Sequence, residues 1–185
     1  MALRDAILAT LLDGESSGYD LAKTFDGSIA NFWMAAPQQL YRELERMEAE
    51  GLVEARLVEQ TRRPNKRVFD LTAAGRDALV EFTTAEMKAP AIRDGLLVQV
   101  QAVDVADADV MLGNIAQRLD LARTRLRRFE RLRDHLLGGE AEEVFLRTSP
   151  RIGPYLTLRR GLMFERENID WCDWALGVLA ARRAD

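Results

Sequence analysis

PQQLYRELERMEAEGLVEARLVEQTRRPNKRVFDL, residues 37–71, is the stretch of the sequence that decides the fold. It predicts an amphipathic helix over 37–50, a tight exit at Gly51, and two strands that flank residues 60–66. Three apolar residues recur at helical spacing and define the buried side of this helix: Leu40, Leu44 and Met47. A helix followed by a two-stranded ribbon with a basic tip is typical of a winged helix-turn-helix, which can lay its helix in a DNA groove.

The opposite side of this helix carries the residues that we expect to read bases. At about 100° per residue, Gln38 and Arg42 lie opposite the apolar stripe and Gln39 lies on one shoulder. A Gln side chain can pair with adenine through two hydrogen bonds, and an Arg side chain can do so with guanine. For an isolated helix, a solvated polar face is the alternative interpretation. The basic hairpin that follows favours DNA binding.

The hairpin is locally basic, although the whole chain has a net charge of −4. Its cations are Arg56, Arg62, Arg63, Lys66 and Arg67, and the same segment holds one acid, Glu59. Attraction to phosphates is local, because salt screens exposed charges beyond about 8 Å. We expect five side chains of the helix and hairpin to contact backbone phosphates: Tyr41, Arg46, Arg62, Arg63 and Lys66. On the first strand, Val53, Ala55 and Leu57 alternate with other residues and should face inward.

The segments around this core predict further helices. Helical spacing of apolar residues over 3–12 indicates a first helix, and Ser17 has the character of an N-cap for a second helix that ends near Phe25. Thr72 is the expected N-cap of a helix over 73–87. Residues 88–90, Lys-Ala-Pro, indicate a boundary. We therefore expect a winged helix-turn-helix DNA-binding domain over 1–89 and a helical dimerisation domain over 90–185.

The second half predicts two long helices with apolar stripes. The first stripe contains Leu112, Ile115, Leu119, Ala122, Leu126, Phe129 and Leu136, and Arg133 interrupts it. The second contains Leu158, Leu162, Ile169, Cys172, Leu176 and Leu179, and Glu165 interrupts it. A spacing of three and four residues sustained over several turns favours pairing of helices and indicates a dimerisation module. The arginines crowded over 123–133 are expected on a solvated or ion-paired face rather than at a second DNA site.

Composition excludes several classes of protein. Among the 185 residues, a single cysteine and a single histidine, His135, make a disulfide framework, a zinc site and a His-dependent triad hard to build. No metal and no cofactor are therefore expected. An enzyme that uses Cys172 as nucleophile is rejected, because this residue lies on the inward stripe of the last helix. No apolar run reaches the length of a membrane span, and we expect a cytoplasmic protein.

With these residues in hand, the chain resembles the PadR-like transcriptional regulators. The matching motifs lie at residues 6–12, 18–22, 39–44 and 68–75. The second half looks like the helical C-terminal domain of the virulence-activator type, through residues 93–94, 155–161 and 165–166 and Trp171. The resemblance implies a fold that is mainly α with a small β-hairpin. It also implies a homodimeric repressor joined by its C-terminal helices. We expect the two heads of such a two-fold dimer to read the halves of an inverted repeat in double-stranded DNA.

The resemblance leaves three points open. Some relatives respond to small aromatic ligands, for which Trp33, Trp171 and Trp174 are the candidate pocket residues; the alternative is that these tryptophans pack in a core or in the dimer seam. The winged fold could instead be a protein-interaction module without specific DNA binding. One departure from the family pattern is Ala35-Ala36-Pro37 at the entry of the recognition helix, because Ala36 is a poor N-cap.

Overall fold

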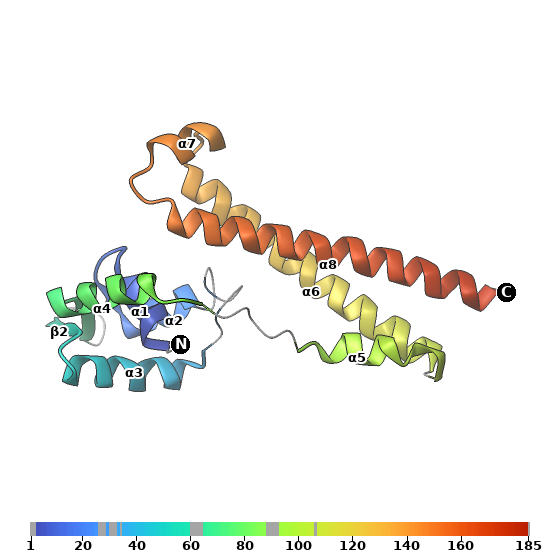
Figure 1. The fold of residues 1–185 in the computed structure, drawn as a ribbon, viewed down its shortest axis with the longest axis horizontal. Helices are drawn as coiled ribbons and strands as arrows, with labels where there is room; N and C mark the ends of the chain where they lie inside the picture. Colours follow the sequence, from blue (N-terminus) through green and yellow to red (C-terminus); the bar gives the residue numbers. More distant parts are fainter. Residues whose placement is uncertain are drawn as a thin grey trace. The chain divides into compact units, whose positions relative to one another are not determined.

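The computed structural model describes residues 3–25, 29, 33, 35–59, 65–87, 93–105 and 107–184. The chain divides into two compact units, residues 1–89 and 90–185 (Figure 1). Unit 1 contains α1 (Leu3–Leu11), β1 (Ser16–Ser17), α2 (Gly18–Thr24), α3 (Pro37–Ala49), β2 (Val53–Val58), β3 (Lys66–Leu71) and α4 (Ala73–Thr84). Unit 2 contains α5 (Gly95–Gln101), the short 3-10 helix η2 (Val103–Val105), α6 (Ala108–Leu137), α7 (Glu142–Thr148) and α8 (Gly153–Ala184). The expected class, mainly α with a small β-hairpin, is confirmed.

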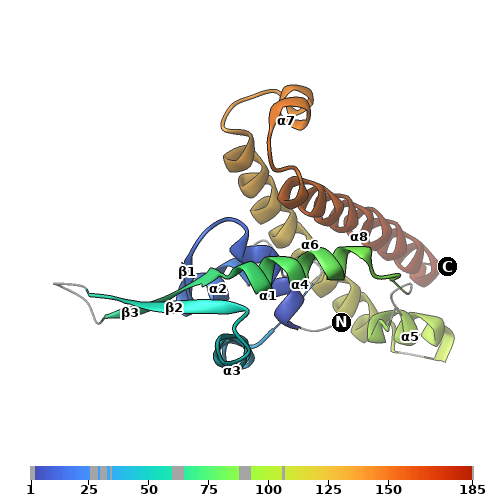
Figure 2. The same ribbon diagram turned by 60° about the vertical axis from the view of Figure 1, so that its left-hand side comes forward.

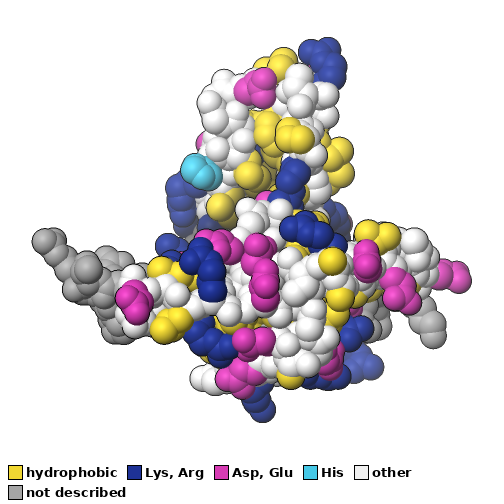
Figure 3. Space-filling model, turned by 90° about the vertical axis from the view of Figure 1, so that its left-hand side faces the viewer, with side chains coloured by type: hydrophobic (Ala, Val, Ile, Leu, Met, Phe, Trp, Pro, Cys, Tyr) yellow, Lys and Arg dark blue, Asp and Glu magenta, His cyan; other side chains and the backbone are white. Residues whose placement is uncertain are grey.

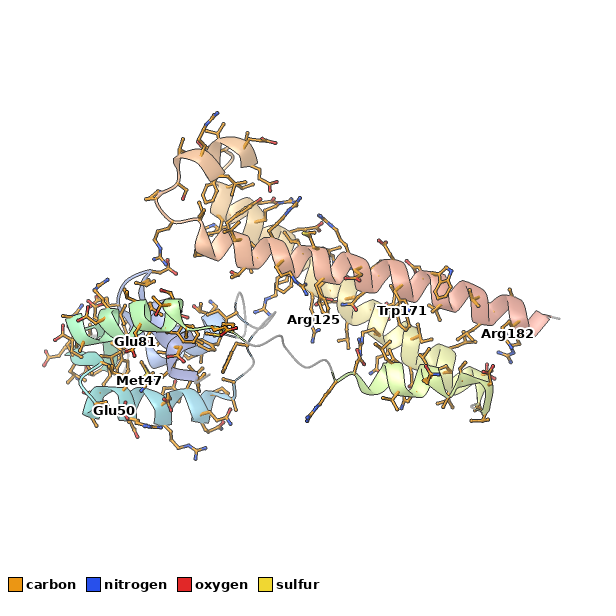
Figure 4. All side chains as sticks on the ribbon, viewed as in Figure 1. Met47, Glu50, Glu81, Arg125, Trp171 and Arg182 are labelled. Atoms are coloured by element: carbon orange, nitrogen blue, oxygen red, sulfur yellow. The ribbon has the colours of Figure 1, made fainter. Side chains whose placement is uncertain are left out.

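The core of unit 1 lies between its helices and one face of the hairpin. Its fully buried side chains include the expected stripe of α3: Leu40, Leu44 and Met47. Met47 points from α3 toward the interior, whereas Glu50 lies at the end of the helix (Figure 4). The two expected N-caps are confirmed, since the hydroxyls of Ser17 and Thr72 accept hydrogen bonds from backbone N–H groups three residues later. The last helix of the unit ends at Thr84, three residues earlier than expected.

The hairpin belongs to a three-stranded antiparallel sheet in the order β1-β3-β2. The register of β2 and β3 runs from Val53 opposite Leu71 to Val58 opposite Lys66. The two-residue strand β1 was not expected, because two serines carry no strand signal of their own. The expectation that Leu57 faces the core is wrong: its side chain is 61% exposed, because the distal half of the hairpin extends beyond the helices that cover its base (Figure 2).

Two motif glycines in unit 1 are required by close packing. A Cβ atom on Gly18 would lie 2.4 Å from the ring of Tyr41, and one on Gly75 would lie 2.1 Å from the backbone oxygen of Leu52. In the second contact, a Cβ on helix α4 would meet a backbone atom of Leu52. Neither the helix nor that backbone can shift without a large cost in packing. Glycine at these positions lets α2 approach α3 and lets α4 approach the start of β2.

Unit 2 is built on the antiparallel pair α6 and α8 (Figure 1). The α6 helix ends at Leu137 and is capped by Gly138, whose φ of 57° is left-handed and therefore favours glycine. On α6 the buried side chain at the start of the stripe is Met111, not the expected Leu112, which is half-buried. Glu165, which interrupts the apolar stripe of α8, nevertheless lies on the buried side of the helix and is 3% exposed.

The arginines of α6 lie on an ion-paired face, as expected. Arg123 pairs with Asp173 at 3.3 Å and Arg125 pairs with Glu165 at 3.6 Å, both across the α6–α8 seam. Figure 4 labels Arg125 beside this helix pair. A bidentate pair between Arg118 and Asp94, at 2.8 and 2.9 Å, ties α6 to the start of α5. None of the helices in the described part of the chain is both long and apolar enough to span a membrane.

Candidate nucleic-acid interface

The N-terminus of α3 is capped by Gln39, a residue that we expected to read bases. Ala36 occupies the N-cap position and has no side-chain acceptor, while Pro37 fills the first helical position. Gln39 compensates, because its Oε1 atom accepts a hydrogen bond from the Ala36 N–H at 3.1 Å. This is half of a capping box. The amide Nε2 of Gln39 is left as the group that can still donate outward.

Gln38 and Arg42 lie on the exposed side of α3, opposite the buried stripe. Arg42 Nε donates to the carbonyl oxygen of Gln38 at 3.3 Å, which orients the guanidinium along the first two turns of the helix. Tyr41 lies on the neighbouring shoulder, 44% exposed, with its ring against Gly18. Tyr19 at the start of α2 is 71% exposed and was not singled out in the sequence, because an isolated tyrosine carries no positional signal.

The expected phosphate-contacting residues have different surroundings. Arg46 Nε donates to Glu50 Oε1 at 2.8 Å, and this hydrogen bond raises the pKa of the guanidinium. Lys66 Nζ lies 3.7 Å from Asp20 Oδ2 of α2, a loose and solvent-exposed pair. Arg62 and Arg63 fall outside the described residues. The arrangement therefore leaves Lys66 more available to a phosphate than Arg46, whose head group is held by a close carboxylate.

Two further cations of the hairpin are engaged by acids that are distant in the sequence. Arg56 forms a two-point ion pair with Glu15, and hydrogen bonding to that carboxylate raises the pKa of the guanidinium. Arg67 pairs with Glu48 of α3, and its guanidinium lies 5.3 Å from the centroid of the Phe69 ring. Figure 3 shows that Lys and Arg side chains also lie among Asp and Glu side chains over the rest of the face in view. Sequence reasoning missed these pairs, because nothing local indicates them.

The three tryptophans lie in different surroundings. Trp33 is half-buried against the core of unit 1 and lines a shallow hollow with Leu3, Gln39 and Arg42. Trp171 is half-buried and packs against the apolar cluster of α6 and α8 (Figure 4). Trp174 is 65% exposed. Within unit 2, the two α8 tryptophans therefore differ: one contributes to the seam and the other faces outward.

The outward face of α8 is unusually apolar for a helix in a single chain. Its exposed side chains include Leu156, Met163, Phe164, Trp174 and Val178, with exposed fractions of 53, 58, 40, 65 and 39%. Phe164 also lies under the guanidinium of Arg160, at 5.1 Å. Apolar side chains in such number on one helix mark an interaction surface. Among the described residues there is no cluster of His, Cys, Asp and Glu that could hold a metal ion.

Family models match both halves of the chain. Residues 7–81 match the transcriptional regulator PadR-like family, and residues 92–180 match the virulence activator alpha C-terminal domain. A Mycobacterium tuberculosis protein described as a probable transcriptional regulator, Rv1176c, is 31% identical over 197 residues, which cover 99% of this chain and 100% of that protein.

Solved structures share the architecture. The Bacillus subtilis PadR protein in complex with operator DNA has a TM-score of 0.77 and 24% identity, and covers 96% of this chain and 98% of that one. The same protein in complex with p-coumaric acid has a TM-score of 0.71 and 23% identity over the same shares. The Vibrio cholerae virulence activator AphA has a TM-score of 0.70 and 29% identity, and covers 98% of this chain and 99% of that one. The chain thus belongs to the PadR-like family of transcriptional regulators, with a C-terminal domain of the virulence-activator type.

Proposed function

We propose that the protein is a DNA-binding transcriptional repressor that acts as a homodimer on an inverted-repeat operator. Unit 1 binds DNA and unit 2 joins the protomers. The observation that carries this proposal is the exposed first half of α3, where Gln38 and Arg42 face solvent in a unit that also holds a two-stranded ribbon. The complex of Bacillus subtilis PadR with operator DNA supports it, because that protein shares the fold. In this arrangement α3 enters the major groove and the hairpin lies along the backbone.

The proposed DNA contacts of α3 and the hairpin divide into two roles. Gln38 and Arg42 read base edges, and Gln39 adds a contact through Nε2 while its oxygen holds the helix start. Tyr41, Arg46, Arg62, Arg63 and Lys66 hold phosphates. Among the described residues of this second group, Lys66 is the best supported as a phosphate contact. Its partner Asp20 lies 3.7 Å away, and 52% of the Asp20 side chain is exposed. A phosphate can displace so loose a partner at little cost.

Dimerisation uses the outward face of α8. A helix surface with Trp174 and Met163 more than half exposed is poorly suited to water, and a second copy of the same helix can cover it symmetrically. A two-fold axis then relates the two α3 helices, so each reads one half of an inverted repeat. We expect the half-site centres to lie about 10 bp apart or at a multiple of that distance.

A small aromatic effector is the regulatory part of this proposal. Its candidate contacts are Trp33 within unit 1, and Trp171 and Trp174 within unit 2; the p-coumaric acid complex of Bacillus subtilis PadR supports the ligand class. An effector must bind two dimer geometries with different affinity, and the coupling is typically about 1–3 kcal/mol. Titration of the protein–operator complex with aromatic carboxylic acids, scored by release of DNA, tests this part by itself.

The first test is an anisotropy titration of the purified protein against the DNA upstream of its own gene. Random duplex serves as the competitor, and salt is varied. Selective binding with a steep salt dependence is expected, because phosphate contacts release counterions. Binding no stronger than to random duplex, with a shallow salt slope, would favour the alternative of a protein-interaction module.

A further inference from the structure

We propose that Arg67 is a positioning residue of the hairpin, not a phosphate contact, and that Glu48 is its partner in this role. The inference rests on the proposed DNA-binding function and deepens it. The ion pair between them joins β3 to the last turn of α3, the helix that reads bases. It thereby fixes the angle at which the hairpin leaves the recognition helix.

The register of the sheet shows why Arg67 faces α3. Residues directly opposite in an antiparallel pair, and residues two apart on one strand, share a face. Arg67 therefore shares a face with Phe69 and Leu71, which are buried at 4 and 5% in the core that contains α3. Arg67 is the last residue of this face before the hairpin leaves the body of unit 1. Its guanidinium lies over the Phe69 ring and against Glu48, so both contacts hold it on the core side.

The other face of the hairpin is held in the same manner. Arg56 and Lys66 belong to this second face, since Arg56 lies opposite Val68, two residues along β3 from Lys66. Arg56 pairs with Glu15 from the turn before β1, and Lys66 lies near Asp20 of α2. Three carboxylates from three different segments thus meet three hairpin cations. Of these three cations, Lys66 lies farthest from its carboxylate, as suits a residue that contacts phosphate. Arg67 is held by two partners, Glu48 and the Phe69 ring, as suits a positioning residue.

The substitution Glu48→Gln distinguishes the two roles by the sign of its effect. If Arg67 contacted a phosphate, removal of Glu48 would release that guanidinium, remove negative charge near DNA and tighten binding. If Arg67 positions the hairpin, the same substitution loosens it and weakens binding. An exposed ion pair contributes little by itself. With two hairpins in each dimer, we expect a loss of about two- to tenfold in operator affinity.

The salt slope supplies the second readout, with Lys66→Gln as the matched control. Each phosphate contact contributes about 0.9 to the slope of log K against log salt, so Lys66→Gln should lower the slope by about 1.8 per dimer. Arg67→Gln removes the same charge from the same strand, one residue away. It should weaken binding while the slope changes by less than about 0.5. A double charge swap, Glu48→Arg with Arg67→Glu, should restore most of the lost affinity.

The experiment uses the full-length dimer and an operator duplex at four salt concentrations. Hydrogen exchange of the hairpin amides in the free protein is measured in parallel, and Glu48→Gln should accelerate it at residues 57–58 and 66–67. Tighter binding by Glu48→Gln, or a slope that falls for Arg67→Gln as far as for Lys66→Gln, overturns the proposal. If the wild type binds no DNA selectively, the proposed function fails. The exchange data then decide the positioning role alone, since unchanged exchange refutes it.

Discussion

Replacement of Glu165 by leucine is expected to stabilise unit 2 at neutral pH. Its carboxylate is 3% exposed on the seam side of α8, between apolar clusters that contain Leu162 on one side and Cys172 on the other. Its partners are Arg125 Nη1 at 3.6 Å and the amide Nδ2 of Asn168, which donates to Oε2 at 3.3 Å. These contacts are long for a buried carboxylate, so they offset only part of the cost of removing it from water.

The magnitude follows from the position of the partner. The side chain of Arg125 is 54% exposed, so its charge stays solvated when the carboxylate is removed. Replacement of buried ion pairs by apolar residues of similar volume is commonly neutral or stabilising by about 1–4 kcal/mol. Leucine at position 165 would also join the two apolar clusters into one seam. We expect a gain in the free energy of unfolding toward the middle of that range.

The dependence on pH has a definite sign. Burial raises the pKa of the Glu165 carboxyl, and the charges of Arg125 and Arg118 on α6 lower it by less. The folded protein therefore binds this proton more tightly than the unfolded chain, whose Glu pKa is about 4.3. The contribution to stability is fully present below that value and is lost as pH rises through the raised pKa of the folded state. The advantage of Glu165→Leu should thus be largest near pH 7 and shrink as pH falls toward 4.

The assay is urea unfolding at fixed protein concentration in a Trp33→Phe background. Fluorescence then reports on α8, which carries Trp171 and Trp174, and fixed concentration keeps dimerisation constant. Glu165→Gln serves as the control, because it removes the charge and keeps the shape. The reasoning is refuted if Glu165→Leu loses more than about 1 kcal/mol at pH 7, or if its advantage grows on acidification.

Four further outcomes are expected. Arg42→Ala should weaken binding to operator DNA by about 1–3 kcal/mol more than it weakens binding to random duplex, and an equal loss on both would show that Arg42 does not read bases. Lys66→Ala should weaken binding to all duplexes alike and flatten the salt slope, so a sequence-selective loss would contradict its assignment to phosphate. Gly75→Ala should destabilise unit 1 by about 1–3 kcal/mol in denaturant titrations, because its Cβ would lie 2.1 Å from the Leu52 oxygen; unchanged stability would refute that packing. Trp174→Asp should shift sedimentation from dimer to monomer at micromolar concentration, and an intact dimer would place the interface elsewhere.

The parts of the fold that sequence predicted are those with a local repeating signal. The stripe of α3 was identified from spacing alone, because each buried residue lies one turn from the next. The N-caps at Ser17 and Thr72 were identified from residue type, since a hydroxyl followed by an amphipathic segment has few other uses. The same alternation argument failed at Leu57, because alternation reports which face a residue lies on. It does not report where the covering helices end.

The candidate site was predicted less completely, for a physical reason. Which cations remain available to DNA depends on carboxylates brought near them by folding, and the partners of Arg56 and Arg67 are 41 and 19 residues distant in sequence. Gln39 shows the same limit. Its place on the helix suggested base reading, and only the geometry at Ala36 shows that its oxygen is engaged in capping.

The acidic total of the chain and its proposed DNA partner are consistent, because attraction to phosphate depends on where the charges lie and not on their sum. Net charge suggests repulsion from DNA, yet several acids of unit 1 neutralise hairpin and helix cations at short range, among them Glu15, Glu48 and Glu50. Each such pair neutralises one cation together with one acid, so the potential near the hairpin depends on where its remaining cations lie. The number of phosphates neutralised must then be smaller than the number of hairpin cations. A salt slope that counts fewer contacts than cations is therefore the expected behaviour of this protein, because its folded structure uses part of its basic charge to hold its own hairpin in place.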